Sequence, residues 1–170
     1  MPFAAPMDAV SLRPIRPDDA AGLVDFHRHL SPDSVYRRFF SVHPVLSAAE
    51  VERFTCVDHI DREALVAADG DRLVAVGRYD RCPGTPEAEI AFVVADEYQH
   101  HGIATALLGA LADAARQVGV ATFVASVLAE NRAMLDVFRH SGFPISTATE
   151  DGVVSVRLTL RARDPASDPG

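Results

Sequence analysis

Residues 98–108 read YQHHGIATALL, and they join a run of apolar strand residues to a helix with small residues on its first turn. A helix start leaves backbone N–H groups without intrahelical partners and carries the positive end of the helix dipole. Gly102 would allow an anion to approach the backbone closely. The segment therefore favours a fold in which a strand leads directly into a helix, and it predicts a phosphate-binding site at their junction.

The first third of the chain is predicted to be mostly helical. Alternating residues over 10–16 predict a first strand. Three helix starts follow, each with a recognisable cap. They are Asp18 for a helix to about Leu30, Ser31-Pro32 for a second helix, and the capping box Ser47 to Glu50 for a third helix to about Val57.

From Glu63 onward the apolar residues recur with period two, which favours strands. Gly119 and Gly142 follow the two remaining helical segments and are expected to end them. The predicted elements are hairpin strands over 63–68 and 72–80 around the turn 69–71, a strand over 88–95, a helix over 102–118, a strand over 122–128, a helix over 131–141, and hairpin strands over 143–149 and 153–160. This order predicts a mixed α/β fold.

Three motifs occur in the order found in the GNAT superfamily of acyltransferases, which the chain resembles over about residues 10–160. They are Gln99-x-x-Gly102-x-Ala104, the helix start Glu130 to Ala133, and the helix end Ser141 to Phe143. The resemblance implies a mixed, mostly antiparallel central sheet of about seven strands flanked by helices, in one domain over 10–161. The segments 1–9 and 162–170 are expected to be flexible tails.

The N-terminal half adds a narrower resemblance. LSPDSVYRRFF (30–40), LSAAEVERFTCVD (46–58) and DREALVA (61–67) are similar to the acetyltransferase domains of bacterial protein lysine acetyltransferases of the Pat type. There the domain is often fused to a cyclic-nucleotide or amino-acid sensing module. None is expected here. Residues 36–40 lie where the family walls its acceptor groove, although the helical spacing of Phe39 and Phe40 favours the core.

The GNAT resemblance implies acetyl-CoA as co-substrate. Main-chain N–H groups of the loop 99–105 would grip the pyrophosphate, and the pantetheine arm would pair with the edge of the preceding strand. The expected cofactor-binding residues are Phe92, Val93, Val94, Gln99, His100, His101, Gly102, Ile103, Ala104, Thr105, Asn131 and Phe138. The alternatives are an ordinary helix start for the loop and, for Asn131, a simple helix cap.

Glu89 is the candidate catalytic residue. It lies in the apolar stretch 88–94 on one strand face with Ala91 and Val93, where a carboxylate needs a partner or a wet cleft. By resemblance to several GNAT enzymes, Glu89 would take a proton, directly or through a water, from an amine with a pKa of about 10.4. The alternative is an exposed carboxylate paired with Arg72 or Arg78 across the sheet.

Phe138 departs from the family pattern. Seven residues after Asn131, many GNAT enzymes carry a tyrosine that protonates the leaving thiolate, whereas phenylalanine has no proton to donate. A thiol with a pKa of about 8.5 leaves tolerably without protonation, so water, Ser126 or another donor could substitute. No general acid is assigned, and Phe138 is expected to be an apolar wall beside the cofactor.

The composition of the chain restricts the classes of binding partner that are expected. A net charge of −8 argues against a nucleic-acid binder and suits cationic acceptors such as amines. Cys56 and Cys82 form no C-x-x-C pair, and the histidine pairs at 27/29 and 100/101 are not completed by further ligands, so no metal site is expected. No signal peptide or membrane span is recognised, which makes the reducing cytoplasm the default location. Both a monomer and a homodimer are compatible with the sequence.

The expected function is direct acetyl transfer from acetyl-CoA to an amine, with a protein lysine side chain named first. Two alternatives stay open. One is N-acetylation of a small amine, an amino acid or an antibiotic, and the other is an acyl-CoA sensor or inactive partner with weak catalysis. Longer acyl groups also stay open. No Ser-His-Asp or Cys-His nucleophile pattern stands out, and direct transfer needs none.

Overall fold

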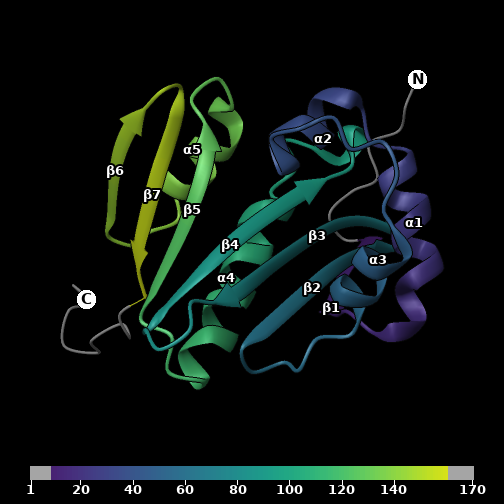
Figure 1. The fold of residues 1–170 in the computed structure, drawn as a ribbon, viewed down its shortest axis with the longest axis horizontal. Helices are drawn as coiled ribbons and strands as arrows, with labels where there is room; N and C mark the ends of the chain where they lie inside the picture. Colours follow the sequence, from purple (N-terminus) through teal and green to yellow (C-terminus); the bar gives the residue numbers. More distant parts are fainter. Residues whose placement is uncertain (1–8, 161–170) are drawn as a thin grey trace.

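A computed structural model of the protein describes residues 9–160, and the predicted tails fall almost wholly outside them. Within these residues, seven strands form one sheet in the order β1-β2-β3-β4-β5-β7-β6 (Figure 1). Their bounds are β1 Val10–Pro14, β2 Arg62–Asp69, β3 Arg72–Arg81, β4 Glu87–Val94, β5 Thr122–Leu128, β6 Ile145–Glu150 and β7 Val153–Thr159. Neighbouring strands are antiparallel except for the parallel pair β4 and β5. The predicted mixed, mostly antiparallel sheet is confirmed.

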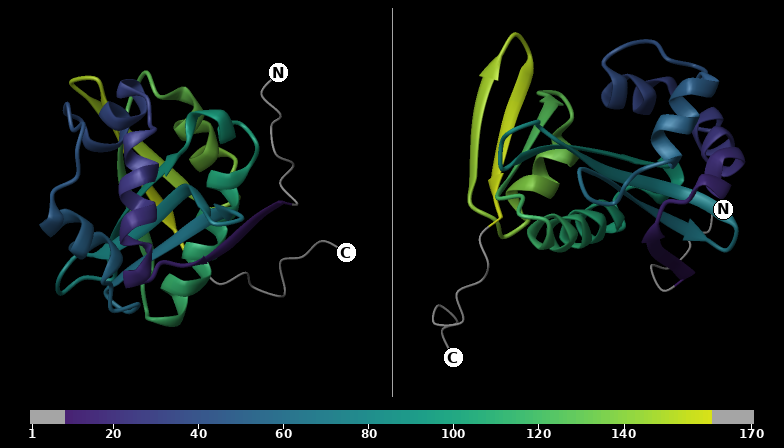
Figure 2. Two further views of the ribbon diagram at one scale, coloured as in Figure 1. Left: turned by 90° about the vertical axis from the view of Figure 1, so that its right-hand side faces the viewer. Right: turned by 60° about the horizontal axis from the view of Figure 1, so that its bottom comes forward.

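Helices flank this sheet on both faces (Figure 2). They are α1 Ala20–Arg28, α2 Pro32–Phe39, α3 Ala48–Thr55, α4 Ile103–Gln117 and α5 Arg132–Arg139. α4 packs on β2 and β3 from one side, whereas α1 packs on β3 and α2 packs on β4 from the other. Because both faces are covered, β2 and β3 are buried almost without alternation along their length.

Two of the predicted helix caps have the expected hydrogen bonds. Ser31 Oγ accepts from the backbone N–H of Ser34 at 3.1 Å, and α2 begins at the next residue after Ser31. Ser47 and Glu50 exchange both bonds of a capping box, at 3.1 and 3.0 Å, in front of α3. These helix starts follow from local sequence alone.

Asp18 does not cap α1, contrary to the prediction. A 3₁₀ turn, Pro17–Asp19, precedes the helix, and α1 also ends earlier than predicted. The carboxylate that organises this corner is Asp19, which accepts from Arg16 N at 2.8 Å and from two guanidinium nitrogens of Arg13 at 2.8 and 2.7 Å. The hydrogen bonds from Arg13 hold the pKa of Asp19 below its usual value. The ion pair with Arg13 of β1 therefore determines that Asp19, rather than Asp18, bonds to the backbone in front of α1.

β4 and β5 pair only near their beginnings. Their ladder joins Glu87 to Thr122, Ala88 to Phe123 and Glu89 to Val124. β4 then continues to Val94 and β5 to Leu128, and the two strands diverge (Figure 1). Beyond the ladder, their facing edges have no strand partner within the described residues, and a wedge opens in the middle of the sheet.

Candidate active site

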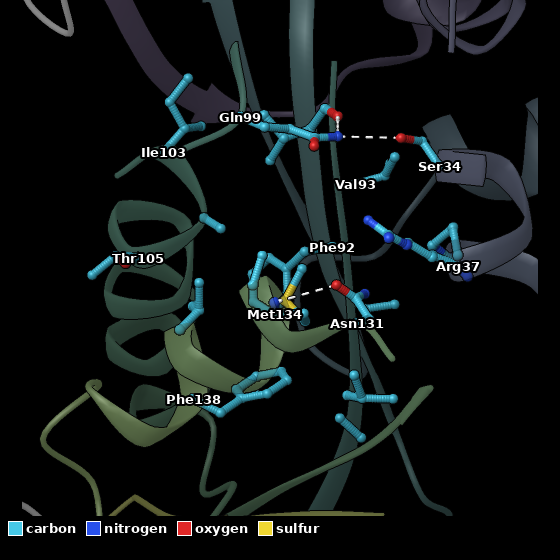
Figure 3. Close-up of a pocket in the computed structure, with 18 of the residues that line it drawn as sticks. Ser34, Arg37, Phe92, Val93, Gln99, Ile103, Thr105, Asn131, Met134 and Phe138 are labelled. Atoms are coloured by element: carbon cyan, nitrogen blue, oxygen red, sulfur yellow. Dashed lines mark hydrogen bonds between the residues drawn. The ribbon is translucent and has the colours of Figure 1, made fainter. Parts of the chain in front are cut away.

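A cavity of about 370 Å³ occupies the wedge between β4 and β5 (Figure 3). Its walls come from β4, β5, α2, α5 and the loop that leads into α4. Of the predicted site residues, it is lined by Phe92, Val93, Val94, Gln99, His100, Gly102, Ile103, Ala104, Thr105, Asn131 and Phe138. Residues that are far apart in the sequence therefore meet around one space.

The loop between β4 and α4 presents backbone N–H groups to this cavity. It leaves β4 through the 3₁₀ turn Asp96–Tyr98, and His100 and Gly102 both adopt positive φ, at 65° and 84°. α4 begins at Ile103, and its first intrahelical bond runs from Ala106 N to Gly102 O at 3.0 Å. The N–H groups of the first turn thus have no intrahelical partner, and no side chain of the N-cap residue bonds to them. An anion at this point would meet free donors and the positive end of the helix dipole.

The side chain of Gln99 anchors this loop. Its Nε2 donates to the carbonyl oxygen of Val94 at 3.0 Å and to Oγ of Ser34 at 3.2 Å (Figure 3). Ser34 in turn donates to Oδ1 of Asp96 at 2.6 Å. The network ties α2, the end of β4 and the loop together. Gln99 therefore positions the backbone donors and adds no charge of its own.

The β4 wall of the cavity alternates as predicted. Phe92 and Val94 are buried on one face, whereas Ala91 and Val93 are half-buried on the other. The rings of Phe92 and Phe138 lie 6.1 Å apart between centroids, with their planes at 58°. Phe138 is 1% exposed, so its ring forms part of the apolar wall.

Asn131 both caps a helix and lines the cavity. Its Oδ1 accepts from the backbone N–H of Met134 at 3.3 Å, which satisfies one of the free donors at the start of α5 (Figure 3). The residue is 9% exposed and belongs to the cavity wall. The capping role that was the alternative is therefore present, and it leaves Asn131 facing the site.

Glu89 and His101 are the predicted site residues that do not line the cavity, and both are exposed. Glu89 lies at the closed end of the wedge, where it pairs with Val124 on β5 and with Asp80 on β3. Its side chain interacts electrostatically with Arg38 of α2.

The alternative pairing of Glu89 with Arg72 or Arg78 does not occur within residues 9–160. Arg72 forms its ion pair with Glu97, which leaves no such bond to β4. Arg78 donates to the carbonyl oxygen of Phe54 at 3.3 Å and lies over the ring of that residue. The Glu89 carboxylate thus forms no ion pair with either of these two arginines of β3.

α2 contributes Ser34, Arg37 and Arg38 to the cavity wall. Burial lowers the pKa of Arg38. The expectation that Phe39 and Phe40 both belong to the core is right for Phe39, which packs against it, and wrong for Phe40, which is 37% exposed. Phe40 follows the last turn of α2 with φ of 57°, and this position takes it off the helix face that meets the core.

Several lining residues were not identified from the sequence. Val137 and Phe138 follow Met134 on α5 at spacings of three and four residues, and this helical pattern is the signal that could have found Met134 and Val137. Ser126 of β5, considered as a proton donor, is exposed and lines the cavity. The site therefore offers an anion-binding end, a strand edge able to bond amides, and an apolar wall.

Neither a metal site nor a membrane-spanning helix is found in the part of the chain that the structure describes. No group of three or more His, Cys, Asp or Glu side chains is arranged there to hold a metal ion. None of its helices has the length and apolar composition needed to cross a membrane.

Known proteins are similar to this chain in sequence and in architecture. Acetyltransferase Pat of Mycolicibacterium smegmatis is 36% identical over 134 residues, which are 77% of this chain and 40% of that protein. The chain thus spans less than half of this relative. The GNAT domain of S. lividans PAT has a TM-score of 0.83 at 41% identity, covering 88% of this chain and 90% of that one.

A more distant structure shares the fold alone. It is yncA from Salmonella typhimurium with its cofactor acetyl-CoA, at 17% identity and a TM-score of 0.73, covering 95% of this chain and 99% of that one. Residues 26–143 match the sequence model of the acetyltransferase (GNAT) family. This match extends over more than half of the chain and includes the loop, the wedge and α5, and the chain therefore belongs to the acetyltransferase (GNAT) family.

Proposed function

We propose that the protein transfers an acetyl group from acetyl-CoA directly to an amine, and that this amine is the side chain of a protein lysine. One observation carries the proposal: free N–H groups at the start of α4 face the same cavity as the unpaired edge of β4. The first feature suits a diphosphate, and the second suits the amides of a pantetheine arm. A single extended ligand that carries both groups would therefore fit the two features together.

In this proposal the loop from Gln99 to Thr105 holds the diphosphate through main-chain donors. Val93 and Val94 flank the pantetheine arm. The N–H group of Val94 polarises the thioester carbonyl, because that of Val93 points toward β3. Phe92 and Phe138 close the apolar side of the cavity and exclude water from it. The loop fixes one end of the thioester, so the carbonyl carbon is presented at the narrow end of the wedge.

Glu89 is the proposed general base. A lysine amine has a pKa of about 10.4 and arrives as ammonium, so it must lose a proton before its lone pair can attack. Since Glu89 does not line the cavity, the proton passes through a water in this scheme. The new C–N bond then forms as the C–S bond breaks, and coenzyme A leaves as a thiolate.

The thiolate needs a proton from a group other than Phe138. Ser126 lines the cavity and is exposed, so Ser126 or a water beside it takes this role in the proposal. Because a thiol has a pKa of about 8.5, departure without concerted protonation is tolerable near neutral pH. The absence of an acidic hydroxyl at Phe138 also favours a second candidate, an acyl-CoA sensor with little turnover.

Two observations support a protein acceptor. The first is the similarity to Pat of Mycolicibacterium smegmatis. The second is a set of exposed apolar side chains on α2, a helix that lines the cavity, and on the segment that follows it. Its members are Tyr36, Phe40, Val42 and Val45. Apolar surface of this kind suits contact with a macromolecule more than with a free amine.

A reducing cytoplasmic location is also part of the proposal. It agrees with the presence of two free cysteines, Cys56 and Cys82, in the structure.

The test is to incubate the protein with labelled acetyl-CoA and a cell extract, and to identify the labelled molecules by mass spectrometry. The 16 basic residues of the chain are all arginine, so every acetylated lysine found must belong to an acceptor. Labelled lysines that depend on the protein support the proposal, and labelling confined to small amines contradicts the lysine acceptor. Tight binding of acetyl-CoA without thiol release on any amine would identify a sensor.

A further inference from the structure

α2 places two neighbouring arginines, Arg37 and Arg38, on the cavity wall, and we call them the arginine pair. Both are half-buried, and Figure 3 shows Arg37 reaching from α2 into the cavity. Neither forms an ion pair with a carboxylate within residues 9–160. Six other arginines of this region do, namely Arg13, Arg62, Arg72, Arg81, Arg116 and Arg157.

The surroundings of Arg38 do not neutralise its charge. Burial lowers the pKa of its guanidinium, and the carboxylates of Asp80 and Glu89 oppose this effect only in part. Asp80 is already engaged, because its Oδ1 accepts from Nε of Arg62 at 2.9 Å. The guanidinium carbon of Arg38 lies 4.8 Å from the ring centroid of Phe39, a contact that supplies no negative charge.

Arg78 on β3 adds to this positive excess. It is 6% exposed, and burial, followed by the charge of Arg38 and then those of Arg62 and Arg53, lowers its pKa to about 9. Arginine side chains keep their charge at pH 7. The carboxylates that act on these four arginines are Asp80, Glu89 and Asp58, the last through Arg62, so a positive excess remains. A partly desolvated site with such an excess favours an anion and repels an ammonium group that arrives alone.

We propose that the arginine pair binds a carboxylate which the acceptor carries close to its reacting amine. This inference rests on the proposed function, and it narrows the acceptors to lysines that have an aspartate or glutamate beside them. A guanidinium group binds a carboxylate through two parallel N–H···O bonds, so the contact orients the acceptor as well as attracting it. The carboxylate of the acceptor offsets the positive charge of these arginines and places the acceptor amine near Glu89.

The rival role for the arginine pair is to hold a phosphate of coenzyme A. The two roles differ in their kinetics. Binding of the acceptor carboxylate affects the KM of the acceptor and its kcat/KM, whereas binding of a phosphate affects the KM of acetyl-CoA. The free N–H groups of α4 already offer a phosphate site elsewhere in the cavity.

The test uses a set of peptides, each with one lysine and one aspartate. The aspartate stands at a different position in each peptide, from two residues before the lysine to three residues after it. Each peptide has a twin with asparagine in place of the aspartate. We expect wild-type kcat/KM to fall about tenfold for the asparagine twin at the best position. Arg37→Gln and Arg38→Gln should each reduce the ratio of kcat/KM between the aspartate peptide and its asparagine twin to about two, and should leave the KM of acetyl-CoA unchanged. Arg28→Gln, at the exposed end of α1, is the matched control and should keep the full ratio.

Charge reversal provides a gain of function that unfolding cannot imitate. Arg38→Glu should prefer a peptide with arginine in place of the aspartate. Equal rates on the aspartate and asparagine peptides at every position overturn the inference, as does a change confined to the KM of acetyl-CoA. Preference for free lysine over every peptide, with 1,5-diaminopentane unused, also overturns it and assigns the pair to an amino-acid carboxylate.

The same experiment separates this inference from the proposed function. Transfer to lysine without any effect of the neighbouring carboxylate removes the inference and leaves the function standing. No transfer to any peptide or amine removes both.

Discussion

The ring of Phe92 covers Gly77 on the neighbouring strand so closely that a Cβ at Gly77 would lie 2.8 Å from Cδ1 of Phe92. The two residues are partners in the register of β3 and β4. A side-chain carbon of Leu111 on α4 lies 3.2 Å from the same point. Because Phe92 also packs on Phe138, the core between the sheet and α4 is continuous with the cavity wall.

Gly77→Ala should therefore destabilise the protein by about 1–3 kcal/mol, since the added Cβ forces the ring of Phe92, and to a lesser degree Leu111 of α4, to shift. It should also weaken binding of coenzyme A, because the displaced ring of Phe92 lines the cavity. Gly109→Ala is the control: a Cβ there meets nothing within 4 Å, and alanine should stabilise α4 by up to about 1 kcal/mol. Urea unfolding measures both variants, and equal stabilities would contradict the packing described.

Gly102→Ala tests the close approach of an anion to the backbone. Gly102 has φ of 84° and open space around its α-carbon, and so has Gly84, with φ of 72°. Both alanine variants should lose about 1–2 kcal/mol of stability from the left-handed backbone. Only Gly102→Ala should raise the Kd of coenzyme A, by about tenfold or more, as measured by calorimetry. Similar affinities in the two variants would show that the loop does not hold the ligand.

Gln99→Met tests the anchor of the loop. Methionine fills a similar volume but cannot donate to Val94 or Ser34, so two acceptors lose a partner. We expect a loss of about 1–2 kcal/mol in unfolding free energy together with weaker binding of coenzyme A. The matched variant is Gln117→Met at the exposed end of α4, which should change neither quantity. Unaltered binding in Gln99→Met would mean that the loop keeps its shape without the anchor.

Glu89→Gln tests the general base. The variant should lower kcat/KM about 100-fold at pH 7, and the deficit should shrink as the pH rises toward the amine pKa of about 10.4, where the free base becomes abundant. Glu87→Gln, two residues earlier on the same strand face, breaks only an exposed ion pair with Arg157 and should stay near wild type. A pH profile of Glu89→Gln that overlies the wild-type profile would exclude the assignment.

Elements with strong local signals could be predicted from the sequence. The β-branched stretch Thr122–Leu128 forms β5 with the bounds expected. Gly119 and Gly142, at φ of 81° and 82°, follow α4 and α5 as the helix-end pattern predicts. The faces of β4 also follow from alternation alone, because the period of a strand determines which side chains share a side.

The wedge could not be predicted in this way. Nothing in the sequence of β4 or β5 marks Glu89 and Val124 as the last pair of their ladder, because the divergence depends on how whole strands twist and pack. The choice between Asp18 and Asp19 likewise depended on Arg13, which approaches from another element. The orientation of Arg37 and Arg38 toward the cavity depends on how α2 lies over β4, which periodicity does not reveal.

The proposed function depends on backbone N–H groups at the start of α4 that bind the diphosphate of the acetyl donor. The most direct measurement is an NMR titration of the 18.3 kDa protein with coenzyme A, following the amide signals of Gly102, Ile103, Ala104 and Thr105. We expect these signals to shift and saturate together, with the same Kd as calorimetry. Coenzyme A that binds while these four amides stay unperturbed, or that does not bind at all, would contradict the proposed function.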